Sequence, residues 1–206
     1  MRERLSVVTF DAHDEGIVDL VLSTDGSRLA STGYDGIVKL WDWEAKTLLA
    51  EYDLQNAVAD AMVFSPDDLQ LAVATPNYVA VWDVETGELE FVLQSGTDTA
   101  NEVLAFSPDG QLLATAGEQG NMRLWNTETS NLEIELPDIG GNRVDGVFSP
   151  DSTLLATTLL GGDASLWNLM DITEKTVGRA PLSVQSNNLF GVEWSSDGYT
   201  LLFFDA

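Results

Sequence analysis

The sequence predicts an all-β chain of repeated four-stranded sheets, and three observations predict it. Tryptophan recurs at steps of 41, 43 and 42 residues, at Trp41, Trp82, Trp125 and Trp167. A serine followed two residues later by aspartate keeps the same spacing, at Ser23, Ser65, Ser107, Ser149 and Ser195. Between these marks lie short, evenly spaced apolar runs without helical periodicity. A fixed period of about 40–45 residues indicates a structural repeat, and radially stacked four-stranded sheets fit that length.

One period, residues 56–93, shows how each repeat gives four strands. The strands are expected at 58–64, 69–75, 78–84 and 88–93. The first ends at Ser65-Pro66-Asp67-Asp68, where proline at the second turn position fixes φ for a type I turn. Pro76-Asn77 and Glu85-Thr86-Gly87 supply the other two turns.

The four strands of a period differ in polarity. The first is nearly all apolar, the second is rich in small residues, the third carries the tryptophan, and the fourth alternates apolar and polar residues. Inner strands that are covered on both faces lose this alternation, whereas an outer strand in contact with water keeps it. We therefore expect stacked sheets with the fourth strand outermost.

Composition limits the partners and the chemistry. The 206 residues include 34 acidic and 9 basic ones, giving a formal charge of −25. This balance argues against nucleic acid or an anionic membrane as partner, because phosphate binding needs a basic patch. With no cysteine and a single histidine, we expect no metal centre and no cofactor. The sequence shows neither a signal peptide nor a membrane-length apolar run, so we expect a cytoplasmic location.

No catalytic motif stands out along the chain. There is no nucleophile elbow, no phosphate-binding glycine loop and no calcium loop of alternating aspartates. Asp11, Asp14 and Glu15 cluster beside Gly16 and would suit a weak cation site. The alternative is a solvated loop, which we favour because Ca²⁺ requires six or more oxygen ligands.

The segment Gly33-Tyr34-Asp35-Gly36-Ile37-Val38-Lys39-Leu40-Trp41-Asp42 resembles the signature end of the WD40 repeat, and Trp82-Asp83 repeats its dipeptide. Trp125-Asn126 and Trp167-Asn168 depart from it by an asparagine. The resemblance covers almost the whole chain. It implies a β-propeller of four-stranded antiparallel blades, with four complete blades and a partial fifth.

The resemblance also implies a buried hydrogen-bonded set in the first repeat, formed by His13, Ser31, Asp35 and Trp41. In that family such a set is structural, and the alternative is that His13 acts as a catalytic base. Later repeats are degenerate, since they carry Pro76, Gln119 and Gly161 at the Asp35 position. Their tryptophans are expected to act as large packing residues in the blade cores: Trp82, Trp125 and Trp167.

The repeats predict blades at about 16–52, 57–94, 101–137 and 142–184. Residues 189–204 match the first two strands of a fifth blade, and 5–10 match an outer strand for it. The tryptophan strand of that blade is absent, so we expect a fragment of a longer propeller with exposed edges that favour association. The alternative is a natural short chain that closes its ring through a second copy or another subunit.

These features predict a non-catalytic scaffold that binds proteins or peptides, within a longer regulatory or sensor protein. Loops on a rigid support commonly carry recognition. On the family pattern, the candidate binding face comprises Tyr34, Asn77, Tyr78, Glu118, Gln119 and Leu160. The alternative is a propeller enzyme, quinoprotein-like or glycoside-active, with its catalytic ligands outside this chain.

Overall fold

Each period folds into an antiparallel sheet whose strands are hydrogen-bonded in chain order. The computed structural model describes residues 11–55, 57–94, 101–117, 122–136, 144–159, 164–170, 178–182 and 189–205. Within these ranges all regular structure is β-strand and none of it is helix, so no helix is present that could span a membrane.

We call the successive sheets blades 1 to 5. Blade 1 contains β1 (Ile17–Leu22), β2 (Arg28–Gly33), β3 (Ile37–Asp42) and β4 (Thr47–Asp53). Blade 2 contains β5 (Ala61–Phe64), β6 (Gln70–Ala74), β7 (Tyr78–Asp83) and β8 (Leu89–Gln94). Blade 3 contains β9 (Asn101–Phe106), β10 (Leu112–Gly117), β11 (Met122–Asn126) and β12 (Leu132–Glu135). Blade 4 contains β13 (Val144–Phe148), β14 (Leu154–Leu159), β15 (Ala164–Asn168) and β16 (Gly178–Leu182). Blade 5 contains β17 (Leu189–Trp194) and β18 (Leu201–Asp205).

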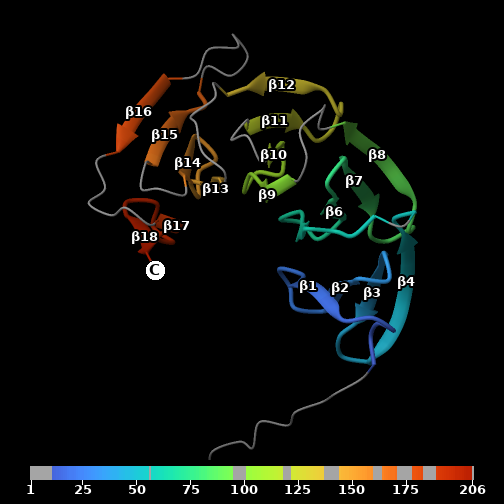
Figure 1. The fold of residues 1–206 in the computed structure, drawn as a ribbon. Helices are drawn as coiled ribbons and strands as arrows, with labels where there is room; N and C mark the ends of the chain where they lie inside the picture. The colour runs from blue at the N-terminus through green and yellow to red at the C-terminus, as the bar shows by residue number, and fades with distance from the viewer. Residues whose placement is uncertain are drawn as a thin grey trace, which may run out of the picture.

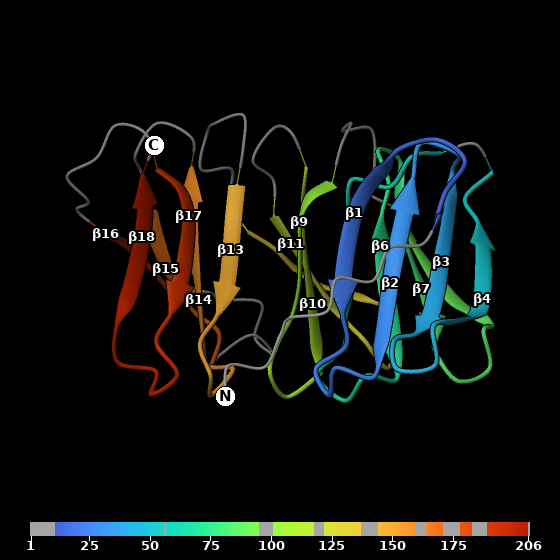
Figure 2. The same ribbon diagram turned by 90° about the horizontal axis from the view of Figure 1, so that it is seen from below.

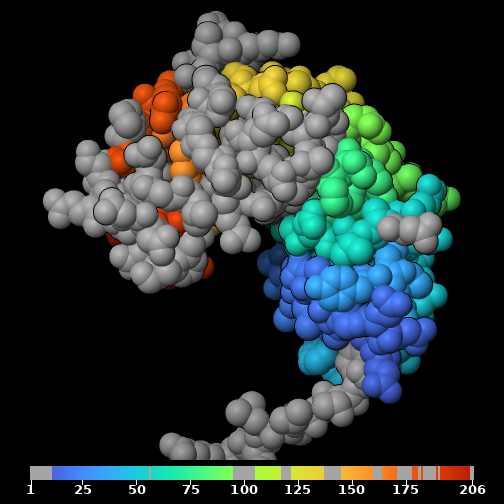
Figure 3. Space-filling model, in the orientation of Figure 1, coloured from blue at the N-terminus to red at the C-terminus, as the bar shows by residue number. Residues whose placement is uncertain are grey.

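The blades follow one another around an arc, with the first strand of each nearest the centre and the fourth outermost (Figure 1). The arc is open between blade 1 and blade 5 (Figure 1). Blade 1, in blue, forms one end of the arc beside the teal surface of blade 2 (Figure 3). This architecture confirms the predicted class, an all-β partial propeller with four four-stranded blades and part of a fifth. The outer strand expected at 5–10 lies outside the described residues.

The recurring serine closes the turn between the first and second strands. In the first turn, Ser23 Oγ donates to Asp25 Oδ1 at 2.8 Å and accepts from the Arg28 N–H at 2.9 Å. The same two bonds recur in the four later turns, with serine-to-aspartate distances of 2.6 Å. These turns lie at the lower edge of the arc in Figure 2, where β13 ends and β18 begins. The serine therefore recurs because it satisfies backbone and side-chain groups within its own hairpin.

The fourth residue of this turn adopts a positive φ in every blade, between 60° and 74°. Glycine tolerates this conformation at three of the positions, Gly26, Gly110 and Gly198. The other two are Asp68 and Ser152, and each bonds to the turn of the preceding blade. Asp68 accepts from the Thr24 and Asp25 N–H groups at 2.7 and 3.0 Å, and Ser152 Oγ accepts from the Asp109 N–H at 3.1 Å. Side chains thus link neighbouring blades where glycine is absent.

Contacts between neighbouring blades are asymmetric. The later blade contributes a phenylalanine from its first strand and a tryptophan from its third, whereas the earlier blade contributes mainly aliphatic side chains. The aromatic pairs are Phe64 with Trp82, Phe106 with Trp125, and Phe148 with Trp167. Each tryptophan therefore fills the contact with the blade that precedes it in the chain.

The expected strand at 58–64 is shorter than predicted, because β5 begins only at Ala61. The Ala57 N–H donates to the Leu54 carbonyl at 3.1 Å, and the Asp60 N–H donates to the Ala74 carbonyl at 2.8 Å. Ala59 is fully buried. These residues form a partly buried crossing from blade 1 to blade 2, and the burial of Ala59 and its neighbours accounts for their apolar composition.

Candidate interaction surface

Four side chains form a hydrogen-bonded chain in blade 1, at the end of the blade opposite the serine turns. His13 Nδ1 contacts both carboxylate oxygens of Asp35, at 3.0 and 2.9 Å. His13 Nε2 lies 2.8 Å from Ser31 Oγ, which also accepts from Trp41 Nε1 at 3.0 Å. Since a carboxylate only accepts, Nδ1 carries a proton, and in the neutral imidazole Nε2 accepts from the Ser31 hydroxyl. Every polar atom at the centre of this chain is therefore paired.

The centre of this hydrogen-bonded set, at His13 and Ser31, is closed to solvent. The His13 side chain and Ser31 are 0% exposed. A Cβ added at Gly33 would lie 2.7 Å from the imidazole Cγ, so the ring rests directly on the backbone at this glycine. This packing supports the structural role over the catalytic alternative, since both imidazole nitrogens are engaged and water has no access to the side chain.

Asp35 joins this chain to the turn that follows β2. Burial acts to raise its pKa, but the hydrogen bond from His13 and the Ile37 N–H, which donates to Oδ1 at 3.2 Å, outweigh burial. The net effect lowers the pKa of Asp35 from its ordinary value of 3.8. Hydrogen bonds to the ionised form thus dominate over desolvation at this site.

The lowered pKa predicts a pH-dependent contribution to stability. Because the folded pKa lies below the unfolded value, the stabilisation is complete above the ordinary pKa and is lost as pH falls through the folded one. We expect the difference in unfolding free energy between the wild type and Asp35→Asn to be largest above about pH 5 and to shrink below about pH 4. Urea unfolding at several pH values measures it, with the exposed Asp14→Asn as the control for loss of one charge. A difference that stays constant with pH would contradict this.

The later blades keep only part of this chain. Trp125 Nε1 donates to Thr115 Oγ1, and Trp167 Nε1 donates to Thr157 Oγ1, both at 2.9 Å. In blade 2 the equivalent residue is Val73, which has no acceptor, and Trp82 instead stacks on Tyr52 with ring centroids 5.0 Å apart. The packing role expected for these tryptophans agrees with their burial, at 9% exposure or less.

Tyr34 lies in the turn between β2 and β3, next to this hydrogen-bonded set. It follows Gly33 and precedes Asp35, and its N–H donates to the Gly16 carbonyl at 3.0 Å. Its side chain is 62% exposed. An aromatic side chain is thus presented to solvent on a turn whose backbone is fixed from both sides.

Not all candidate binding residues share this setting. Asn77 is exposed, but Tyr78 is half-buried, and its hydroxyl donates to the Leu54 carbonyl at 3.1 Å. Tyr78 also packs against the core shared by blades 1 and 2. Glu118, Gln119 and Leu160 lie outside the described residues. The structure therefore places Tyr34 and Asn77 in solvent but makes Tyr78 part of the blade contact.

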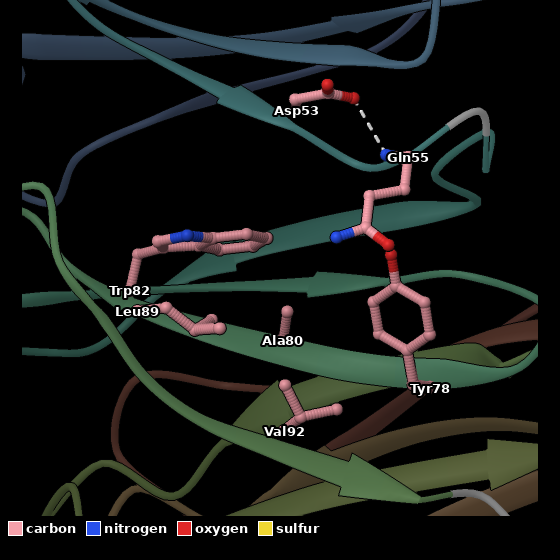
Figure 4. A pocket seen from close by; sticks show the side chains of 7 residues that line it. All are labelled: Asp53, Gln55, Tyr78, Ala80, Trp82, Leu89 and Val92. Carbon is pink, nitrogen blue, oxygen red and sulfur yellow. Dashed lines mark hydrogen bonds between the residues drawn. The ribbon is translucent and has the colours of Figure 1, made fainter.

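A groove that the sequence did not indicate lies beside Tyr78, between β4 and β8 (Figure 4). Its volume is about 220 Å³. Its lining consists of Asp53, Gln55, Tyr78, Ala80, Trp82, Leu89 and Val92. The only sequence signal for it is the residue two positions before each tryptophan, which is alanine in blade 2.

The described part of the chain contains no group of three His, Cys, Asp or Glu side chains that could hold a metal ion. This includes Asp11, Asp14 and Glu15, which were the candidates for a weak cation site. The solvated loop stays a prediction for these three residues.

The amino-acid sequence is similar to those of several known proteins. The family described as "WD domain, G-beta repeat" matches residues 4–42 and 95–126. The small ribosomal subunit protein RACK1 of Schizosaccharomyces pombe is 35% identical over 133 residues, which cover 60% of this chain and 42% of the relative. The Protein LST8 homolog of Drosophila melanogaster is 28% identical over 131 residues, covering 62% and 41%. The target of rapamycin complex subunit wat1 of S. pombe is 25% identical over 122 residues, covering 59% and 39%. The chain thus spans about two fifths of the length of these curated relatives.

Proposed function

Because this chain belongs to the WD40-repeat family, we propose that it is an interaction scaffold that binds a protein or peptide at the end of its blades marked by Tyr34. The observation that carries the proposal is the presentation of this side chain. Tyr34 is 62% exposed, while the neighbouring Gly33 and Asp35 are fixed by contact with the buried His13. A rigid aromatic side chain contributes contact area at little entropic cost, and tyrosine is enriched at binding hot spots.

The relatives support this class of function. One is named as a subunit of a target of rapamycin complex and another as a small ribosomal subunit protein, so both are named as parts of larger assemblies. The charge of −25 favours protein partners over nucleic acid or an anionic membrane. We further propose a cytoplasmic location and a place within a longer regulatory or sensor protein. The described residues give no support to the enzymatic alternative.

Self-association, or contact with a remainder of the propeller, is part of the same proposal. The face of blade 1 that points away from blade 2 exposes Leu20 and Leu22 by about half, and the exposed Leu48 lies opposite Trp41 on the same face. Exposed apolar side chains on one sheet face favour association. This face supports an expectation of contact with further polypeptide.

The test compares Tyr34→Ala with Tyr199→Ala. Tyr199 is 90% exposed and follows the Ser195 turn at the opposite end of the blades, so it matches the chemistry of the change but not its place. In affinity capture from the native host with quantitative mass spectrometry, we expect Tyr34→Ala to lose at least about tenfold of a defined protein that Tyr199→Ala retains. Thermal melting should be unchanged in both variants. Equal recovery with both variants would contradict the proposed face.

A further inference from the structure

The groove between β4 and β8 differs from the equivalent place in the other blades. In each blade, the residue two positions before the tryptophan lies opposite a residue of the outermost strand. These cross-strand pairs are Lys39 with Glu51, Ala80 with Val92, Arg123 with Glu135, and Ser165 with Pro181. Only blade 2 has two small or medium apolar residues at this position.

In the other three blades, a basic side chain of the protein itself occupies this place. Lys39 Nζ lies 3.4 Å from Glu51 Oε1, and an Arg123 nitrogen lies 2.9 Å from Glu135 Oε1. In blade 4 the outermost strand supplies the cation. Arg179 Nε donates to Ser165 Oγ at 3.0 Å, and the guanidinium lies 5.5 Å from the centroid of the Trp167 ring. In each of these three blades, a cationic side chain therefore lies at the pair of positions formed by the residue two before the tryptophan and its partner on the outermost strand.

In blade 2, Ala80 stands where blades 1 and 3 have Lys39 and Arg123. The resulting groove has apolar walls, since Ala80, Leu89 and Val92 lie between Trp82 at one end and Tyr78 at the other (Figure 4). Leu89 and Val92 are 52% and 39% exposed. Its volume of about 220 Å³ is room for one long side chain.

Polar groups line the upper rim of the groove. Asp53 Oδ1 accepts the Gln55 N–H at 2.7 Å, and the Gln55 side chain extends over the groove toward the Tyr78 hydroxyl (Figure 4). Burial raises the pKa of Tyr78, and the negative charge of Asp53 raises it further, so the field of this carboxylate reaches the groove. The seven lining residues include one carboxylate and no cation.

We propose that this groove receives an arginine side chain from a partner protein, in the place where the other blades hold a cation of their own. The aliphatic stem packs on Ala80, Leu89 and Val92, and the guanidinium lies near Trp82, with Asp53 and Gln55 as polar partners. Arginine suits the site because its planar guanidinium stacks on aromatic rings and pairs with carboxylates, as Arg179 does over Trp167 in blade 4. This assignment rests on the proposed function in that the occupant is a protein, but it concerns a separate surface from Tyr34.

The proposal is tested with a defined probe and the whole chain. The probe is the peptide Gly-Leu-Arg-Leu-amide carrying fluorescein at its N-terminus, and its binding is followed by fluorescence anisotropy. A second peptide with citrulline in place of arginine keeps the shape and removes the charge. We expect the arginine peptide to bind at millimolar concentration or better and the citrulline peptide to bind at least about tenfold more weakly.

The decisive variant is Ala80→Lys with Val92→Glu, which copies the Lys39–Glu51 pair of blade 1 into the groove and leaves the net charge unchanged. We expect it to weaken binding of the arginine peptide at least about tenfold. Thr47→Lys with Leu49→Glu adds the same two charges on β4, outside the lining, and should bind as the wild type does. If the double variant in the groove fails to fold, Asp53→Asn replaces it, and weaker binding of the arginine peptide is again expected.

Three outcomes would overturn the assignment: no binding of the arginine peptide to the wild type, equal binding of the citrulline peptide, or undiminished binding by the groove variant. Tyr34→Ala is expected to leave binding of the arginine peptide unchanged. A chain that loses partner capture with Tyr34→Ala but never binds this peptide would keep the proposed function and refute the groove alone.

Discussion

Replacing Trp167 with alanine is expected to lower the free energy of unfolding by about 3–5 kcal/mol. The side chain is 1% exposed and packs between blades 3 and 4 against Ala114, Ala116 and Leu124. Truncation removes the indole, its hydrogen bond to Thr157 and its contact with the Arg179 guanidinium. The loss is a large part of the roughly 5–15 kcal/mol by which domains are usually stable. Urea unfolding followed by circular dichroism measures it.

Trp43→Ala is the matched control, because it removes the same side chain from a surface position. Trp43 is 37% exposed and contacts Lys46, whose Nζ lies 3.4 Å from the ring centroid. We expect this change to cost less than about 1 kcal/mol, the size of an exposed cation–π contact. Equal losses from the two substitutions would show that the contact between blades 3 and 4 does not stabilise the chain as described.

Ser31→Ala is expected to cost about 2–4 kcal/mol, although it removes a single oxygen atom. That oxygen bonds both His13 Nε2, at 2.8 Å, and Trp41 Nε1, at 3.0 Å, in a site without solvent. Its loss removes one hydrogen bond from each of two buried nitrogens, and leaving a buried polar group unsatisfied costs about 1–3 kcal/mol. Thermal or urea unfolding measures the change.

Thr157→Val provides the comparison, because it breaks the single hydrogen bond to Trp167 and keeps the shape of the side chain. We expect it to cost about half as much as Ser31→Ala, since it removes one buried hydrogen bond instead of two. Ser31→Thr keeps a hydroxyl at this position, as in blades 3 and 4, and should therefore cost less than Ser31→Ala. If Ser31→Ala proves no more costly than Thr157→Val, the extended chain in blade 1 adds nothing beyond one bond.

The strand pattern and the turns were predictable because they depend on local chemistry. Ser65 and Asp67 bond to groups within the same hairpin, so their spacing carries the information in the sequence alone. The tryptophan period gave the third strand of each sheet in the same way. The direction in which each tryptophan packs was not predictable, since it depends on which face of a strand meets the preceding blade.

The groove was missed for a related reason. Ala80 looks unremarkable until it is aligned with Lys39 and Arg123 through the neighbouring tryptophans. Even then, its opposition to Val92 depends on a register shift between β7 and β8, near Trp82. Tyr78 shows the same limit. Its position in a turn predicted exposure, whereas its hydroxyl is committed to the Leu54 carbonyl of the preceding blade.

A ribosome makes these blades in chain order, each before the one that follows it. Until the next blade has been synthesised, each folded blade presents to water the face that will receive it. In blade 3 this face carries Ala114, Ala116 and Leu124, and the large aromatic rings, Phe148 and Trp167, arrive with blade 4. While blade 4 is being synthesised, the exposed face of blade 3 therefore carries aliphatic side chains. At the contact between blades 3 and 4, the large aromatic rings therefore enter the solvent only when the aliphatic face that buries them has already been made.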